Sequence, residues 1–220
     1  MSEEQQQQQP HDPMESLFGS SLLIKANSPN EKTTTALKGT DLVLLYFSAS
    51  CKFRFTVLLA LYGLLGFIRI NASNRQTGCP PCRAFTPLLV SFYNNCAKDG
   101  KVEIVFVSSD NSVQSFNDYY GKMPWLSIPV DPGTAQIKSK LAQALKVSGI
   151  PALIVLDAKT GYLVKSNARD EVTSVGGDKS KGLVLISSWK QKETVPLESL
   201  VQDIPDITIR GALWSLLMIL

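Results

Sequence analysis

The chain has one histidine, His11, and only four cysteines among its 220 residues. A closed zinc site needs four nitrogen or sulfur ligands, and beyond one C-x-x-C pair the chain offers only Cys51, Cys96 and His11. The cysteines are also too few and too scattered for the disulfide framework of a small secreted domain. We therefore expect no metal site and a reducing compartment, with a cytoplasmic location and the nucleus as a further one.

Clustered charge and long apolar runs are absent as well. The formal net charge is +3 and the basic residues are scattered, which argues against nucleic acid as a partner. No glycine-rich dinucleotide motif is present, so we expect no bound cofactor. Residues 1–15 are glutamine-rich and partly acidic, which indicates a disordered tail rather than a secretory signal. The apolar stretches at 55–68 and 212–220 are shorter than the roughly 20 residues of a membrane span, so we do not expect membrane insertion.

The chain does contain Cys79-Pro80-Pro81-Cys82 at the start of an amphipathic helix that we expect over 83–98, kinked at Pro87. The helix dipole and unpaired backbone N–H groups stabilise a thiolate, which makes Cys79 the candidate nucleophile. Cys82 lies within one turn and is the candidate thiol that resolves a mixed disulfide. Alternatively, the two cysteines form half of a zinc site or a static disulfide. The small number of other ligands disfavours the zinc site, and the short loop between the cysteines disfavours the disulfide.

Apolar strands and amphipathic helices alternate through the rest of the chain. Continuous apolar runs predict core strands, and a 3.6-residue period predicts helices. The expected strands are 42–48, 102–108 and 152–157, and the expected helices are 110–120, capped by Asp110 or Asn111, and 136–146. Two hairpins are expected, from 21–25 to 32–35 and from 152–157 to 162–165. The order predicts an α/β domain with a central mixed sheet, flanking helices and an N-terminal β-hairpin.

Three further residues have both a structural and a functional interpretation. A cis bond at Ile150–Pro151 would turn backbone groups toward a neighbouring site, whereas a trans bond would make Pro151 an ordinary turn residue. Trp125 is either a core aromatic residue or part of a site. Cys96, in the middle of the 83–98 helix, is interpreted as a small core residue rather than a reactive thiol.

Four motifs occur in a recognisable order: Tyr46 to Ser50, Cys79 to Pro87, Asp118 to Trp125, and Gly149 to Leu153. Together they resemble the tryparedoxin and nucleoredoxin branch of the thioredoxin superfamily. The resemblance implies a thioredoxin fold over 16–168 and a redox-active Cys79–Cys82 pair as the only redox group. It also implies a cis-proline at Pro151 and substrate contacts from Pro151, Ile150, Trp125, Pro80 and Pro81.

The implied activity is that of a protein-disulfide reductase, a thiol–disulfide oxidoreductase that uses the CPPC dithiol. Its partners would be oxidised proteins or peroxidases as substrates, and an upstream thiol reductant or reductase. Many thioredoxins have a buried acid at the position of Tyr46, so the resemblance leaves the proton acceptor of Cys82 unidentified. A membrane-anchored exchange protein of the kind that serves cytochrome assembly, which shares the W-C-P-P-C motif, is a further alternative.

Residues 51–78 interrupt this pattern, because the family has Y-F-S-A-S-W-C-P-P-C without a break. Long structureless loops are uncommon inside compact domains. Possible codons for 51–53 and 77–78 contain a splice donor and an acceptor, and their removal keeps the reading frame and restores the tryptophan. We therefore favour a retained intron over an evolved insertion or an interfacial helix. If the segment is translated, displacement of Cys79 from the helix would leave a redox-inactive binding module.

Beyond residue 168 the resemblance fades. We expect residues 169–220 to form a C-terminal extension that is partly irregular, with a polar loop at 170–181. An edge strand is expected at 182–186 and a short helix near 197–201.

Overall fold

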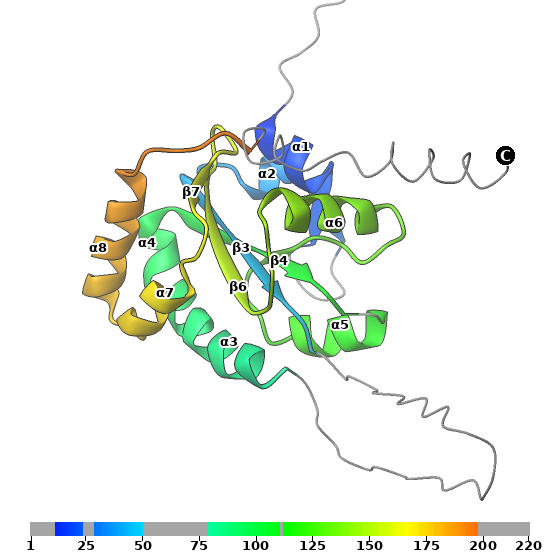
Figure 1. The fold of residues 1–220 in the computed structure, drawn as a ribbon, viewed down its shortest axis with the longest axis horizontal. Helices are drawn as coiled ribbons and strands as arrows, with labels where there is room; N and C mark the ends of the chain where they lie inside the picture. The colour runs from blue at the N-terminus through cyan, green and yellow to red at the C-terminus, as the bar shows by residue number, and fades with distance from the viewer. Residues whose placement is uncertain (1–11, 24–28, 51–78, 111, 198–220) are drawn as a thin grey trace, which may run out of the picture.

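The computed structural model describes residues 12–23, 29–50, 79–110 and 112–197. The expectations for residues 1–11, 51–78 and 198–220, including Cys51 and the intron hypothesis, lie outside the described residues. Seven strands form one mixed sheet in the order β2-β1-β5-β4-β3-β6-β7 (Figure 1). The strands are β1 (Ser21–Leu23), β2 (Asn30–Lys32), β3 (Leu42–Ser48), β4 (Val102–Ser108), β5 (Leu126–Ser127), β6 (Ala152–Asp157) and β7 (Leu163–Lys165).

Helices connect these strands and cover the sheet. They are α1 (Pro13–Phe18), α2 (Thr33–Ala36), α3 (Pro80–Phe92), α4 (Lys98–Gly100), α5 (Val113–Tyr120), α6 (Thr134–Ala144), α7 (Arg169–Val175) and α8 (Lys179–Lys190), with a π-helical segment, η1 (Tyr93–Ala97), between α3 and α4. β3 pairs in parallel with β4 and antiparallel with β6, and all seven residues of β3 are buried. The predicted central strand, mixed sheet and flanking helices are confirmed.

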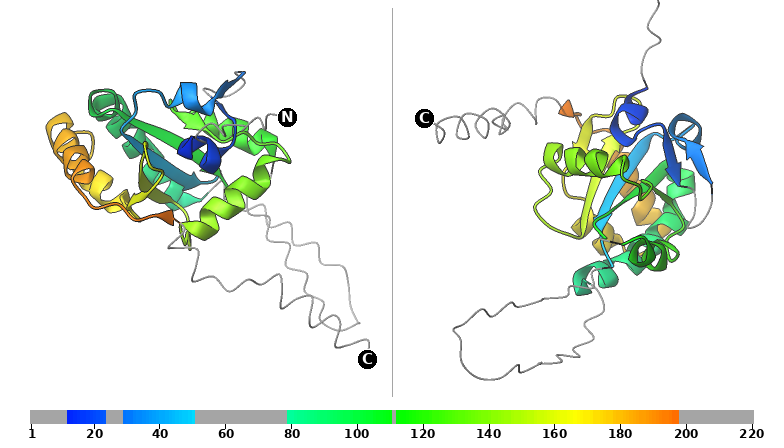
Figure 2. Two further views of the ribbon diagram at one scale, coloured as in Figure 1. Left: turned by 90° about the horizontal axis from the view of Figure 1, so that it is seen from above. Right: turned by 90° about the vertical axis from the view of Figure 1, so that its right-hand side faces the viewer.

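The side chains of the central strands alternate between two apolar cores. Leu44 and Tyr46 of β3 face a core shared with α3, α5, α7 and α8. Val43 and Leu45 point to the opposite face, where α1 and α6 pack. The sheet therefore lies between two layers of helices (Figure 2). A strand that is buried on both faces needs a continuous apolar run, which is why the sequence identified β3, β4 and β6.

The N-terminal hairpin is confirmed, with corrected boundaries. β1 pairs with β2 antiparallel, but Thr33–Ala36 forms the short helix α2 and does not extend the second strand. The last residues of the tail expected over 1–15 are helical, because α1 begins at Pro13. The Asp12 side chain accepts hydrogen bonds from the N–H groups of Met14 and Glu15 at 2.8 and 3.2 Å. A capping aspartate followed by proline is a helix start that the sequence analysis missed.

The cap predicted for the 110–120 helix is corrected as well. α5 begins at Val113, and Ser112 caps it by accepting a hydrogen bond from the Ser115 N–H. Asp110 instead joins two strand ends: its carboxylate accepts hydrogen bonds from the Ser50 N–H at 2.8 Å and the Ser108 hydroxyl at 2.9 Å. This contact fixes the chain at the carboxyl end of β3, directly before residue 51.

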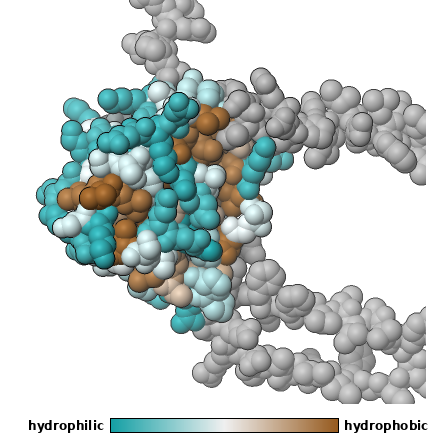
Figure 3. All heavy atoms as spheres, turned by 60° about the vertical axis from the view of Figure 1, so that its left-hand side comes forward, coloured by the Kyte–Doolittle hydropathy of each residue, from teal (hydrophilic) through white to brown (hydrophobic). Residues whose placement is uncertain are grey.

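The segment after residue 168 is the largest correction. The loop expected over 170–181 contains α7, and the edge strand expected over 182–186 lies inside α8. Trp189 of α8 is fully buried and packs on Phe92 of α3, with ring centroids 6.2 Å apart. The outer side of α8 is exposed, as Val184 shows with 71% exposure, and the molecular surface on this side is largely hydrophilic with separate apolar patches (Figure 3). Residues 169–190 thus complete the domain core and are not an appendage to it.

Candidate active site

Cys79 is the N-cap residue of α3, in an extended backbone conformation. Pro80 and Pro81 are the first helical residues, where the missing N–H of proline costs no hydrogen bond. The helix proper starts with the bond from the Arg83 N–H to the Cys79 carbonyl, 3.0 Å long. Cys79 is half-buried and both prolines are exposed. The motif therefore places the less buried of its two cysteines at the positive end of a helix, as the sequence predicted.

Cys82 lies one turn inside α3 and is fully buried. Its sulfur is 2.7 Å from the sulfur of Cys79, and both residues are free thiols. Burial raises the pKa of Cys82 to about 11, and the hydrogen bond with the Cys79 thiol acts in the same direction. The Ser48 hydroxyl and the Ala49 N–H hydrogen-bond the Cys82 sulfur and partly offset this rise. Cys79 is thus more exposed than Cys82. This difference suits Cys79 to attack an external disulfide and Cys82 to react in the following step.

The contacts of Cys82 also bring two distant parts of the chain together. Ser48 ends β3 and Ala49 follows it, whereas Cys82 belongs to α3. The carboxyl end of β3 and the first turn of α3 therefore meet, although residues 51–78 separate them in the sequence. The displacement of Cys79 from the helix, which was expected if the segment is translated, does not occur.

Four buried hydroxyl groups lie behind Cys82, and we call Tyr46, Ser48, Thr86 and Tyr119 the hydroxyl cluster. The hydroxyl oxygen of Tyr119 is 3.0 Å from that of Ser48 and 2.7 Å from that of Thr86. The hydroxyl oxygens of Tyr46 and Thr86 are 2.8 Å apart. Thr86 also donates to the Cys82 carbonyl at 2.8 Å. From the sequence, only Tyr46 was singled out. Tyr46 and Ser48 lie two residues apart on one face of a strand, and Cys82 and Thr86 lie one turn apart on a helix. This spacing is the signal that could have pointed to Ser48 and Thr86.

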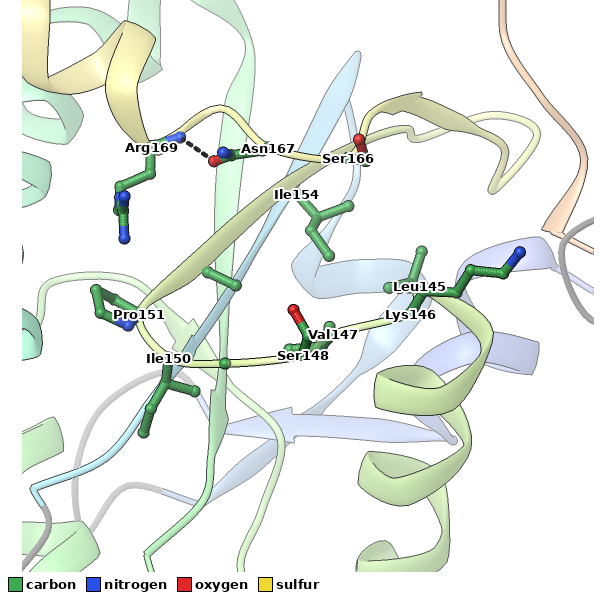
Figure 4. A pocket seen from close by; sticks show the side chains of 12 residues that line it. Leu145, Lys146, Val147, Ser148, Ile150, Pro151, Ile154, Ser166, Asn167 and Arg169 are labelled. Carbon is green, nitrogen blue, oxygen red and sulfur yellow. Dashed lines mark hydrogen bonds between the residues drawn. The ribbon is translucent and has the colours of Figure 1, made fainter.

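The Ile150–Pro151 peptide bond is cis, as the resemblance implied. Ala152 of β6 pairs with Phe47 of β3, so Pro151 lies level with Ser48 at the same end of the sheet as the two cysteines. Pro151 is buried and Ile150 half-buried. A pocket of about 320 Å³ lies beside this loop (Figure 4). It is lined by residues 145–152, Ile154, Ser166, Asn167 and Arg169.

Trp125 is not at the rim of this site. It is 1% exposed and packs edge-on against Tyr46 and Tyr93, with ring centroids 6.0 and 5.6 Å apart. The Tyr120 hydroxyl donates to its backbone carbonyl at 2.7 Å. Its indole N–H has no hydrogen-bond partner among the residues described. The core-aromatic interpretation is therefore correct, and the assignment of Trp125 to substrate binding is wrong. Cys96 is likewise buried, in η1, as expected.

Comparison with known proteins agrees with this geometry. Residues 39–163 match the family model described as thioredoxin-like. The chain belongs to the thioredoxin-like family. Tryparedoxin of Trypanosoma brucei brucei is 40% identical over 113 residues, which cover 51% of this chain and 74% of that protein. Probable nucleoredoxin 1 of Arabidopsis thaliana is 46% identical over 102 residues, 46% of this chain but only 17% of that protein.

A solved structure of tryparedoxin II complexed with glutathionylspermidine has a TM-score of 0.56 and 29% sequence identity. The match covers 74% of this chain and 92% of that one. These relatives place the thioredoxin-like chain in the tryparedoxin and nucleoredoxin branch, which consists of thiol oxidoreductases. Within the described ranges, no helix combines the length and the apolar character needed to cross a membrane.

Proposed function

We propose that the chain is a thiol–disulfide oxidoreductase that reduces protein disulfides with its CPPC dithiol. One observation carries the proposal: the half-buried Cys79 is the N-cap residue of α3, and its sulfur lies 2.7 Å from the sulfur of the buried Cys82. Cys79 attacks as its thiolate, which is the nucleophilic form of a cysteine. The redox group is the Cys79–Cys82 pair itself, so no bound cofactor takes part.

The reaction proceeds in two exchanges. The Cys79 thiolate attacks one sulfur of the substrate disulfide, forms a mixed disulfide and releases the first substrate thiol. Cys82 then attacks the Cys79 sulfur, which forms the Cys79–Cys82 disulfide and releases the second substrate thiol. An upstream thiol reductant or reductase returns the pair to the dithiol. The substrate gains two electrons and two protons, and the cysteine pair loses them.

Substrate binding is assigned to the surface around Cys79. Pro80 and Pro81 are exposed beside it, and the loop with Ile150 and cis-Pro151 ends at the same edge of the sheet. This loop offers backbone groups to an extended substrate segment, and the adjacent pocket with Arg169 provides room for more of it. The proposed partners are oxidised proteins, peroxidases among them, and small thiols of the class of glutathionylspermidine, which is bound in a structure of tryparedoxin II. We propose the cytoplasm, and the nucleus in addition, as the location.

The test is the reduction of insulin by the full-length chain with dithiothreitol as the electron source. We expect catalysis by the unchanged chain, loss to the uncatalysed rate in Cys79→Ser, and a trapped mixed disulfide in Cys82→Ser. Cys96→Ser is the matched control and is expected to keep its activity, because Cys96 is buried in η1. Equal rates in the unchanged chain and Cys79→Ser would contradict the proposal and favour the redox-inactive binding module.

A further inference from the structure

The hydroxyl cluster is an uncharged polar group in an otherwise apolar core, and it ends at the Cys82 sulfur. Tyr46 and Ser48 are fully buried, and Thr86 and Tyr119 are each 6% exposed. Such groups are costly to bury unless each hydroxyl has a hydrogen-bond partner, and here each one does. The cluster connects β3, α3 and α5 at the site of the proposed chemistry.

The contacts permit two short series of hydrogen bonds that both lead to Cys82, one to its carbonyl and one to its sulfur. Each hydroxyl has a single proton to donate. Thr86 donates its proton to the Cys82 carbonyl at 2.8 Å and can accept from Tyr46 at 2.8 Å, and Tyr119 can donate to Ser48 at 3.0 Å. The Ser48 proton is then directed at the sulfur of Cys82, which it contacts. In this arrangement every proton is used once, and the Tyr119 and Ser48 hydroxyls are aligned to stabilise negative charge on the Cys82 sulfur.

β3 places no carboxylate beside Cys82, because this strand contains no acidic residue. The titratable groups that surround the Cys82 thiol are Cys79 on its own helix, Tyr46 from β3 and Tyr119 from α5. Burial raises the pKa of Tyr46, so its hydroxyl stays protonated at neutral pH. The Asp110 carboxylate, at the same end of the sheet, is engaged by the Ser50 N–H and the Ser108 hydroxyl. Arg83, next to Cys82, is exposed.

We propose that the hydroxyl cluster takes the place of a buried acid in the resolving step: Ser48 donates a hydrogen bond to Cys82 as its thiolate forms, and Tyr119 positions Ser48. The inference rests on the disulfide exchange proposed above. In this step a bond forms between the sulfurs of Cys82 and Cys79, and the bond between Cys79 and the substrate sulfur breaks. Cys82 is oxidised and the substrate sulfur is reduced. The departing substrate thiolate takes up the proton that Cys82 loses, so the cluster stores no proton.

The experiment compares Ser48→Ala and Tyr119→Phe with the unchanged full-length chain. A hydrogen bond to a charged group stabilises it more than one between neutral groups. We therefore expect resolution of the mixed disulfide at neutral pH to slow on the order of tenfold in Ser48→Ala, and by less in Tyr119→Phe. In the Cys79→Ser background, the pH profile of Cys82 alkylation should shift to higher pH in both variants. The formation rate of the mixed disulfide by Cys79 should not change.

The matched control is Tyr120→Phe, which removes a neighbouring buried hydroxyl that donates to the Trp125 carbonyl and lies outside the cluster. It should leave both the resolution rate and the Cys82 profile unchanged. Resolution at the unchanged rate in Ser48→Ala and Tyr119→Phe, with unshifted Cys82 profiles, would overturn the inference. Failure of the unchanged chain to form a mixed disulfide at all would instead refute the proposed function. Tyr119→Phe keeps the ring and its packing, so it remains informative if Ser48→Ala does not fold.

Discussion

Glu103 is a largely buried carboxylate, and both of its oxygens are hydrogen-bonded by one tyrosine. The Tyr93 hydroxyl donates to both carboxylate oxygens of Glu103, at 3.0 and 3.1 Å, and the Ile104 N–H donates to one of them at 2.8 Å. Burial nevertheless raises the pKa of Glu103 above its ordinary value of 4.5. Because the folded state favours the protonated acid, Glu103 stabilises the fold below pH 4.5, and this contribution is lost as the pH rises through its folded-state pKa.

This arrangement predicts a pH-dependent effect of Tyr93→Phe. The variant loses a donor that stabilises the charged form, so the pKa of Glu103 should rise further. We expect little change in the free energy of unfolding at pH 4 and a loss of about 1.5–3 kcal/mol near pH 7. Urea unfolding across this pH range measures the difference. Tyr162→Phe, a half-buried tyrosine before β7, is the control. An equal loss at both pH values would show that the Tyr93 hydroxyl contributes independently of the charge on Glu103.

Helix α8 packs on η1 at a position where only glycine fits. A Cβ at Gly182 would overlap the Cys96 sulfur and would lie 3.2 Å from the Cys96 Cβ. We expect Gly182→Ala to lower the free energy of unfolding by about 1–3 kcal/mol, because the packed core cannot absorb the extra methyl group. In the Cys96→Ala background the sulfur is absent, so the same change should cost much less. Urea unfolding of the four proteins gives the coupling energy, and additive effects would contradict this packing.

The sequence predicts a helix or strand well where a local pattern determines it, and poorly where tertiary contacts determine it. The runs at β3, β4 and β6 are apolar on both faces, so their patterns identified them. In α8, only Gly182, Ile186 and Trp189 are buried. The β-branched residues among 182–186 made this segment resemble a strand, so the sequence predicted an edge strand there. At the candidate site, CPPC predicted Cys79 at a helix N-terminus with Cys82 one turn inside it, and Gly-Ile-Pro pointed to the cis bond at Pro151. The roles of Ser48 and Tyr119 could not be read from the sequence, because they depend on three elements meeting.

The whole molecule collects its reactive groups at one edge of the sheet. The carboxyl end of β3 supplies Ser48, the first turn of α3 supplies both cysteines, and the start of β6 supplies Pro151. The parallel pairing of β3 with β4 and the antiparallel pairing with β6 fix these positions through contacts in the core. Contacts of the sheet and of α3 therefore hold the site together within the described residues.

This dependence predicts the result of replacing residues 51–78 with a single tryptophan. Because the Cys82 sulfur already contacts Ser48 and Ala49, a short connection has little distance to span. The entropic cost of closing a connection grows with its length, so the shortened chain should be more stable by on the order of 1–2 kcal/mol. It should also reduce insulin at least as fast as the full chain. Urea unfolding and the reduction assay test both expectations. A folded but inactive short chain would mean that residues 51–78 contribute to catalysis, and the retained-intron hypothesis would then be wrong.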